Sequence, residues 1–144
     1  MVCLINHARA RWHLPRLRAQ AEVEQAAQGH TGQMVSINSL THVGAGGSSP
    51  GARLDQAGYR WAAFGEILAT GFATPRGAVN AWLRSGDHCP IMLSPLYRAI
   101  GVGVVPGAVR GVANVPGTWT VDFALPAGSR APSGNSGPAN SCPH

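Results

Sequence analysis

Two histidines and one glutamate are the residues of this chain whose types and settings could support chemistry. His42 follows the end of a predicted long helix and precedes a glycine-rich loop. His88 lies in the segment Ser-Gly-Asp-His-Cys-Pro, just after another predicted helix, and Glu66 interrupts an otherwise apolar predicted strand. A carboxylate in such a strand needs a partner, because burying an unpaired charge is costly. Spacing along the chain does not by itself place the three residues together.

The other four histidines fit structural or incidental roles. His30 lies on the apolar stripe of the predicted second helix, where we expect a packed ring with satisfied nitrogens. His7, His13 and His144 lie on a predicted polar face, beside a helix break and in the C-terminal tail. We therefore expect no chemistry from these four.

The elements that must position the candidate residues follow from hydrophobic periodicity and turn signals. Helices are predicted over residues 3–12, 19–40, 49–57 and 75–84. Residues 86–95 contain two prolines and a glycine, which indicates an irregular segment or a short helical turn.

Strands are predicted over residues 62–72, 97–105, 109–115 and 118–125, with Pro116–Gly117 as a hairpin turn. Helices followed by antiparallel strands indicate an α+β fold with an antiparallel sheet covered by helices. One domain is expected over residues 1–126. Residues 127–144 lack large apolar side chains and predict a disordered tail.

Length and charge limit the possible functions. The chain has 144 residues, as expected for a single globular domain, and a net charge of +5 in which every basic residue is arginine. No apolar run is long enough for a transmembrane segment. The basic charge suggests a nucleic-acid partner, but Arg9 and Arg11 would lie about 200° apart around a helix. We therefore expect no nucleic-acid binding.

Three cysteines are present, Cys3, Cys89 and Cys142, and no Cys-x-x-Cys motif occurs. A zinc ribbon or a thioredoxin-type redox site is therefore unsupported. The odd count allows one disulfide and one spare thiol.

An ordered set of short motifs resembles the CAP superfamily, in its bacterial SCP-like branch. This superfamily comprises cysteine-rich secretory proteins, antigen 5 and pathogenesis-related 1 proteins. The resemblance covers about residues 2–125, and its main segments are Leu4–Arg9, Ala26–His30, Leu40–His42, Gly65–Glu66, Ala81–His88, Ile100–Val104 and Trp119–Phe123.

The resemblance implies an α-β-α sandwich with one cleft lined by His42, Glu66 and His88. The family's second glutamate falls on Ser85, and Asp87 is the acidic residue that could replace it. The asparagine that usually follows the strand glutamate is Ile67 here, and the loop at Gly44–Gly47 lacks its usual acid. These departures argue against conventional cleft chemistry.

Three roles for the cleft residues remain open at this stage. They could form hydrogen bonds that tie helices to the sheet. His42 and His88 could bind a divalent metal such as zinc, with water completing the shell. A hydrolase would use such a metal, or Glu66 as a general base.

Two functions follow from the resemblance. The first is a secreted binding module for a small ligand, a lipid or a metal. The second is a metal-assisted hydrolase acting on peptide or cell-envelope material. The resemblance also implies a Cys3–Cys89 disulfide with Cys142 free, and an exported, monomeric protein whose signal peptide and first residues precede this chain.

Overall fold

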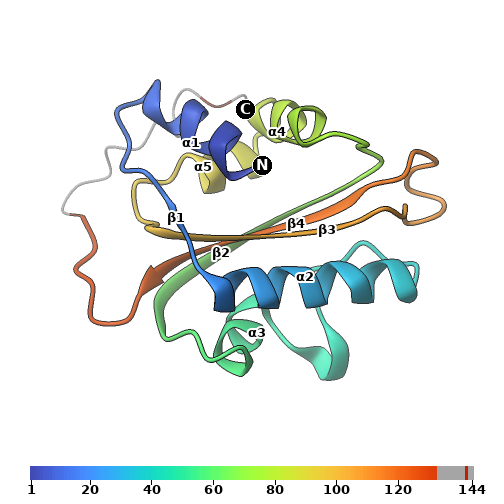
Figure 1. The fold of residues 1–144 in the computed structure, drawn as a ribbon, viewed down its shortest axis with the longest axis horizontal. Helices are drawn as coiled ribbons and strands as arrows, with labels where there is room; N and C mark the ends of the chain where they lie inside the picture. The colour runs from blue at the N-terminus through green and yellow to red at the C-terminus, as the bar shows by residue number, and fades with distance from the viewer. Residues whose placement is uncertain (133–141, 143–144) are drawn as a thin grey trace.

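The computed structural model describes residues 1–132 and Cys142, and its elements form three layers (Figure 1). The middle layer is a four-stranded sheet with the strand order β1 (Arg18–Ala19), β3 (Ala99–Val105), β4 (Thr118–Pro126) and β2 (Trp61–Thr70). One face is covered by α1 (Val2–Ala10), α4 (Pro75–Leu83) and α5 (His88–Met92). The other face is covered by α2 (Ala21–Ser36) and α3 (Pro50–Gln56), with a short 3₁₀ turn, η1 (Ala45–Gly47), between them. The predicted α-β-α sandwich is confirmed.

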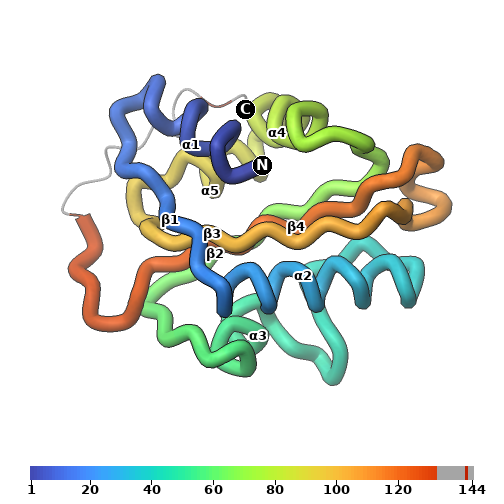
Figure 2. The backbone as a smooth tube through the Cα atoms, viewed as in Figure 1, coloured from blue at the N-terminus to red at the C-terminus, as the bar shows by residue number. Residues whose placement is uncertain are grey.

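The sheet brings together strands that are far apart in sequence, as the backbone trace shows (Figure 2). β4 pairs antiparallel with both β2 and β3, while the short β1 runs parallel to β3. The register sets Glu66 of β2 directly opposite Asp122 of β4, and Asp122 opposite Gly101 of β3. These three residues therefore share one face of the sheet.

Apolar side chains form a core on each face of the sheet. Ile5, Trp82 and Phe123 belong to the cluster beneath α1, α4 and α5, and Val23 and Leu54 to the cluster beneath α2 and α3. The face that carries Glu66 is the α2–α3 face, because a Cβ on Gly101 would collide with the backbone of Val23 in α2. Glu66 and Asp122 are thus enclosed between the sheet and these two helices.

Helix boundaries follow local sequence signals. Ser49 and Thr74 each cap a helix by accepting a hydrogen bond from a backbone N–H three residues on, and each precedes a proline in the first turn. α2 ends at Ser36, four residues before the predicted end, because Asn38 adopts a left-handed φ of 55°. The backbone N–H of Ser39 then bonds to the carbonyl of Met34 and closes the helix end.

The strand predicted over residues 109–115 is wrong. This segment forms turns in which the carbonyl of Val109 accepts hydrogen bonds from the N–H groups of Val112 and Ala113. The N–H of Val109 bonds to Thr70 Oγ1, so the segment is anchored across the end of β2 instead of pairing along it. β3 and β4 pair directly, and residues 106–117 form the loop between them.

The predicted Cys3–Cys89 disulfide is also wrong, because Cys89 pairs with Cys142 at a Cα–Cα distance of 5.7 Å and Cys3 is a free, exposed thiol. Cys89 and Cys142 lie in an apolar cluster with Ala8 of α1. Cys3 is about 140° away from Ala8 around the helix, so it faces away from Cys89. Apart from Cys142, the predicted tail from position 133 onward lies outside the residues that the structure describes.

Arg9 of α1 is completely buried. Its guanidinium donates hydrogen bonds to the carbonyls of Pro15, Met92 and Ser94, which ties α1 to the end of α5 and to the neighbouring loops. Burial, with a smaller contribution from the charge of Arg98, lowers the pKa of Arg9 to about 10. Arg9 is therefore a structural residue.

Within residues 1–132, no helix has the length and apolar character needed to cross a membrane.

Candidate functional site

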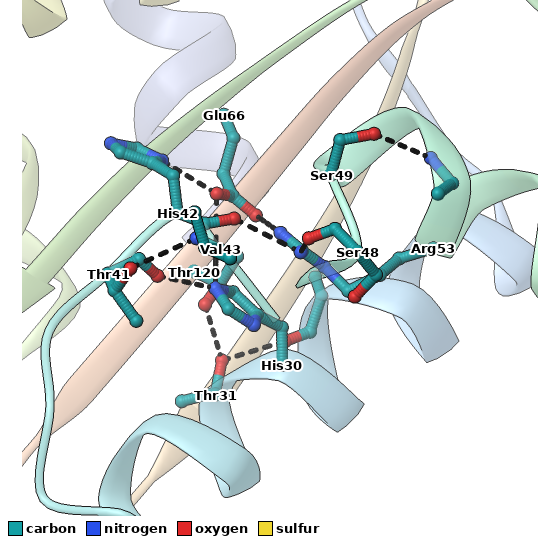
Figure 3. A network of polar contacts seen from close by, with 12 residues as sticks. His30, Thr31, Thr41, His42, Val43, Ser48, Ser49, Arg53, Glu66 and Thr120 are labelled. Carbon is teal, nitrogen blue, oxygen red and sulfur yellow. Dashed lines mark hydrogen bonds and ion pairs between the residues drawn. The ribbon is translucent and has the colours of Figure 1, made fainter. Parts of the chain in front are cut away.

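Glu66 is the centre of a polar cluster on the α2–α3 face of the sheet (Figure 3). It belongs to the last half of β2, where every neighbour from Ile67 to Thr70 is also buried, and it is only 6% exposed. A carboxylate at such a position needs positive or hydrogen-bonding partners from the layer above it. The structure supplies these from α3 and from the loop between α2 and α3.

Among the described residues, each carboxylate oxygen of Glu66 accepts one hydrogen bond. Arg53 Nη2 donates to Oε2 at 2.6 Å, and His42 Nδ1 lies 2.7 Å from Oε1 (Figure 3). Arg53 is on α3 with its side chain 8% exposed, whereas the His42 side chain is 56% exposed. Glu66 therefore joins a buried guanidinium to an imidazole at the surface.

Arg53 also fixes the loop that carries His42. Its Nη1 donates to the backbone carbonyls of His42 and Ser48, at 3.1 and 2.9 Å. The loop is further held by His30 of α2, whose Nε2 lies 2.7 Å from the carbonyl of Thr41. These contacts position the backbone on both sides of His42.

His30 is packed in the interior, as the sequence predicts. Among the described residues, however, only one of its two ring nitrogens has a hydrogen-bond partner. Its Nε2 bonds to Thr41 and lies 4.0 Å from Glu66 Oε1, while its buried Nδ1 has no hydrogen-bond partner among the described residues. Burial lowers the pKa of His30, and the charge of Glu66 opposes this shift. The ring is therefore neutral at neutral pH, and its Nε2–H donates to the Thr41 carbonyl.

His88 is the first residue of α5, on the opposite face of the sheet from α2. Its Nδ1 lies 2.7 Å from the hydroxyl oxygen of Ser85, which also accepts a long hydrogen bond from the His88 backbone N–H. Burial lowers the pKa of His88, the charge of Asp87 raises it, and the charge of His42 lowers it further.

The structure brings two of the three predicted cleft residues into contact. His42 and Glu66 form a hydrogen bond, whereas the side-chain partner of His88 is Ser85. Asp87 is exposed and acts on His88 through its charge. Among the residues that the structure describes, no group of three or more His, Cys, Asp or Glu side chains could hold a metal ion. A site based on His42 and His88 would therefore use two protein ligands.

Arg53 is the site residue that sequence reasoning missed. The available signal was the requirement of Glu66 for a partner, combined with an arginine beside Leu54 in a short predicted helix. Ser85 was identified only as a replacement for a family glutamate, and its hydrogen bond to His88 was not foreseen.

Comparison with known proteins identifies the family. The model for the cysteine-rich secretory protein family, CAP, matches residues 2–123. The chain belongs to the CAP family. The CAP domain thus accounts for nearly all of the described residues, and Glu66 lies on its second strand.

Relatives of this CAP chain include two Bacillus subtilis proteins. One is named uncharacterized protein YkwD, 30% identical over 105 residues that make up 73% of this chain and 41% of YkwD. The other is named uncharacterized membrane protein YlbC, 30% identical over 70% of this chain and 29% of YlbC. The chain spans less than half the length of these curated relatives.

Solved structures show the same fold. An extracellular protein of Bacillus anthracis containing an SCP domain superposes with a TM-score of 0.74 and 26% identity, covering 84% of this chain and 37% of that one. An outer surface protein of Borrelia burgdorferi superposes with a TM-score of 0.76 and 22% identity, covering 87% of this chain and 89% of that one. The second likeness concerns the fold alone.

Proposed function

We propose that this CAP domain is an extracellular binding module whose ligand site is formed by His42 and His88. One observation carries the proposal: each imidazole uses its Nδ1 for an internal hydrogen bond of 2.7 Å. Within the described part of the chain, neither Nε2 has a hydrogen-bond partner in the structure. Both rings are therefore oriented while their outer nitrogens remain available.

A divalent cation such as zinc suits this pair of nitrogens. Imidazole is a preferred ligand of Zn²⁺, and a carboxylate that binds the other ring nitrogen fixes the tautomer and raises the basicity of the ligand. Glu66 has this relationship to His42. His42 and His88 would hold the ion through Nε2, with water completing the coordination. With two protein ligands instead of three or four, we expect modest affinity.

The experiment is calorimetric titration of the chain with zinc chloride, comparing the wild type with H42A and H88A. We expect one site in the wild type and at least a tenfold loss of affinity in each variant. H13N is the matched control, because His13 is exposed and asparagine tolerates its left-handed φ of 55°. Equal binding by all four proteins, or no binding by the wild type, would contradict the proposal.

The geometry favours binding over the alternative of a metal-assisted hydrolase. A general base must have a free lone pair within reach of the proton that it removes. Each oxygen of Glu66 already accepts one hydrogen bond, from His42 or from Arg53, and the side chain is only 1% exposed, so its remaining lone pairs are not open to solvent or substrate. Glu66 therefore orients His42 and is not free to act as the base.

A second candidate ligand site lies between α1 and α4, on the other face of the sheet. A cavity of about 480 Å³ is lined by the apolar side chains of Leu4, Trp12 and Val79 together with Arg11 and Arg76. Apolar walls with two guanidinium groups suit an amphiphilic anion, with its chain against the walls and its acid group near the arginines. This observation supports a lipid or fatty acid as a second ligand.

Titration with palmitate tests the second candidate. We expect V79D to abolish binding, because it introduces a charge into the apolar wall, and R11Q/R76Q to weaken it several-fold. R84Q is the matched control, since Arg84 is exposed and does not line the cavity. Unchanged binding in V79D would place palmitate elsewhere, and no binding by the wild type would remove this candidate.

A further inference from the structure

Asp122 is a second buried carboxyl group beside the site. It lies in the middle of β4, with Glu66 directly opposite on β2 and Gly101 opposite on β3, and it is 0% exposed. Residues paired across antiparallel strands have Cβ atoms about 5 Å apart and point to the same face. The carboxyl of Asp122 therefore lies close to that of Glu66, under α2.

In the part of the chain that the structure describes, no hydrogen-bond donor stabilises a negative charge on Asp122. Neither carboxyl oxygen has a hydrogen-bond partner among the described residues. Arg53 directs Nη2 to Glu66 and Nη1 to the carbonyls of His42 and Ser48. A buried carboxylate without donors is far costlier than the neutral acid, so the proton stays on the group.

The charges around Asp122 also balance with one proton retained. The titratable and charged groups of this cluster are Glu66 on β2, Arg53 on α3, His30 on α2 and, at the surface, His42 of the loop. Arg53 is the permanent cation, and its ion pair with Glu66 neutralises one carboxylate. His30 is neutral, because burial lowers its pKa. A second carboxylate would be uncompensated, and two like charges at this distance cannot both ionise easily.

We propose that Asp122 is a positioning residue that holds a proton at neutral pH and thereby keeps Glu66 the single anion of this cluster. Glu66 then accepts the Nδ1–H of His42, and His42 Nε2 is left as a lone-pair donor toward solvent. The inference rests on the same site as the proposed function, but it concerns protonation of the protein itself. Burial first, and the negative charge of Glu66 second, raise the pKa of Asp122 well above its ordinary value.

Carboxyl ¹³C NMR on wild-type protein labelled at aspartate tests this directly. The chain has three aspartates, Asp55, Asp87 and Asp122, so three signals are expected. The signal of the buried Asp122 should keep the chemical shift of a protonated carboxyl at pH 7. Three signals that all ionise below pH 5 would overturn the proposal. No zinc or other ligand is needed, so failure of the proposed function would leave this result unaffected.

The D122N variant assigns the signal and tests the link to His42. Asparagine has nearly the shape of the protonated acid, so D122N should fold and keep the Nδ1–H tautomer of His42 in ¹⁵N NMR at pH 7. In the wild type, ionisation of Asp122 at alkaline pH should shift the His42 nitrogen resonances, and D122N should lack that step. D55N is the matched control and should retain the step. If the His42 nitrogen resonances respond in the same way to alkaline pH in the wild type and in D122N, Asp122 has a packing role alone.

Discussion

The ion pair between Arg53 Nη2 and Glu66 Oε2, at 2.6 Å, joins α3 to β2 beneath the surface. Both side chains are almost completely buried, at 8% and 1% exposure. Replacing either residue alone leaves the other as a buried charge without its partner. The energetic consequence is therefore asymmetric: breaking the pair is costly, whereas replacing both groups need not be.

We expect R53M to lower the free energy of unfolding by about 3–5 kcal/mol, the usual cost of removing one partner from a buried pair. The double variant R53M/E66L should be closer to the wild type, since it leaves no unpaired charge. Urea unfolding at pH 7 measures the free energy of unfolding of the wild type and of each variant. R60M is the matched control, because Arg60 is exposed. A loss below about 1 kcal/mol in R53M, typical of a surface ion pair, would contradict the burial of this one.

The fold was predictable because several independent signals agree. The proline-containing caps at Ser49 and Thr74 give the starts of α3 and α4, and the apolar stripe gives α2. The prediction of a strand over residues 109–115 was wrong because it relied on the valines of this segment, a residue type that is common in strands. Its backbone instead forms turns anchored by Thr70, a contact 39 positions away in sequence.

The site was predictable only in part, because it too depends on contacts between residues that are far apart in sequence. A glutamate in an apolar strand shows that a partner must exist, but it does not say which of 11 basic residues provides it. Arg53 reaches Glu66 because α3 packs over β2, which is a tertiary relationship. Asp122 shows the same limit, since its proximity to Glu66 follows from strand register and not from local sequence.

We expect His30 to make the protein sensitive to mild acid. Burial lowers the pKa of His30 from its ordinary value of 6.5, so the unfolded chain binds a proton more readily than the folded one as the pH falls below 6.5. The stability that the neutral ring contributes above this pH is therefore lost on acidification, by at most about 1.4 kcal/mol per pH unit for one proton.

Urea unfolding between pH 7.5 and 5 tests this for the wild type and H30Q, in which the glutamine amide can still donate to Thr41. H30Q should lose less stability on acidification than the wild type. H13N should follow the wild type, since His13 is exposed. Parallel pH profiles for the wild type and H30Q would show that other groups, such as His88, account for the sensitivity.

Close packing of α2 on β3 depends on Gly101. A Cβ at this position would overlap backbone atoms of Val23 and Glu24, which cannot move independently of the helix. We expect G101A to destabilise the fold by about 1–3 kcal/mol, the range for overpacked cores. G29A is a matched control within α2, where a Cβ meets nothing within 4 Å, and it should stabilise the helix by about 0.5–1 kcal/mol. Thermal unfolding of the two variants should therefore shift in opposite directions.

The Cys89–Cys142 disulfide should contribute substantially to stability. It links residues 53 positions apart, for which the chain-entropy model gives about 4 kcal/mol. We expect C142S to lower the unfolding free energy by an amount of this order under oxidising conditions. C3S should have no effect, because Cys3 is an exposed free thiol. Alkylation without reduction should modify one cysteine, which peptide mass spectrometry should identify as Cys3. Modification of Cys142 in the unreduced protein, or equal stability of C142S and the wild type, would contradict this pairing.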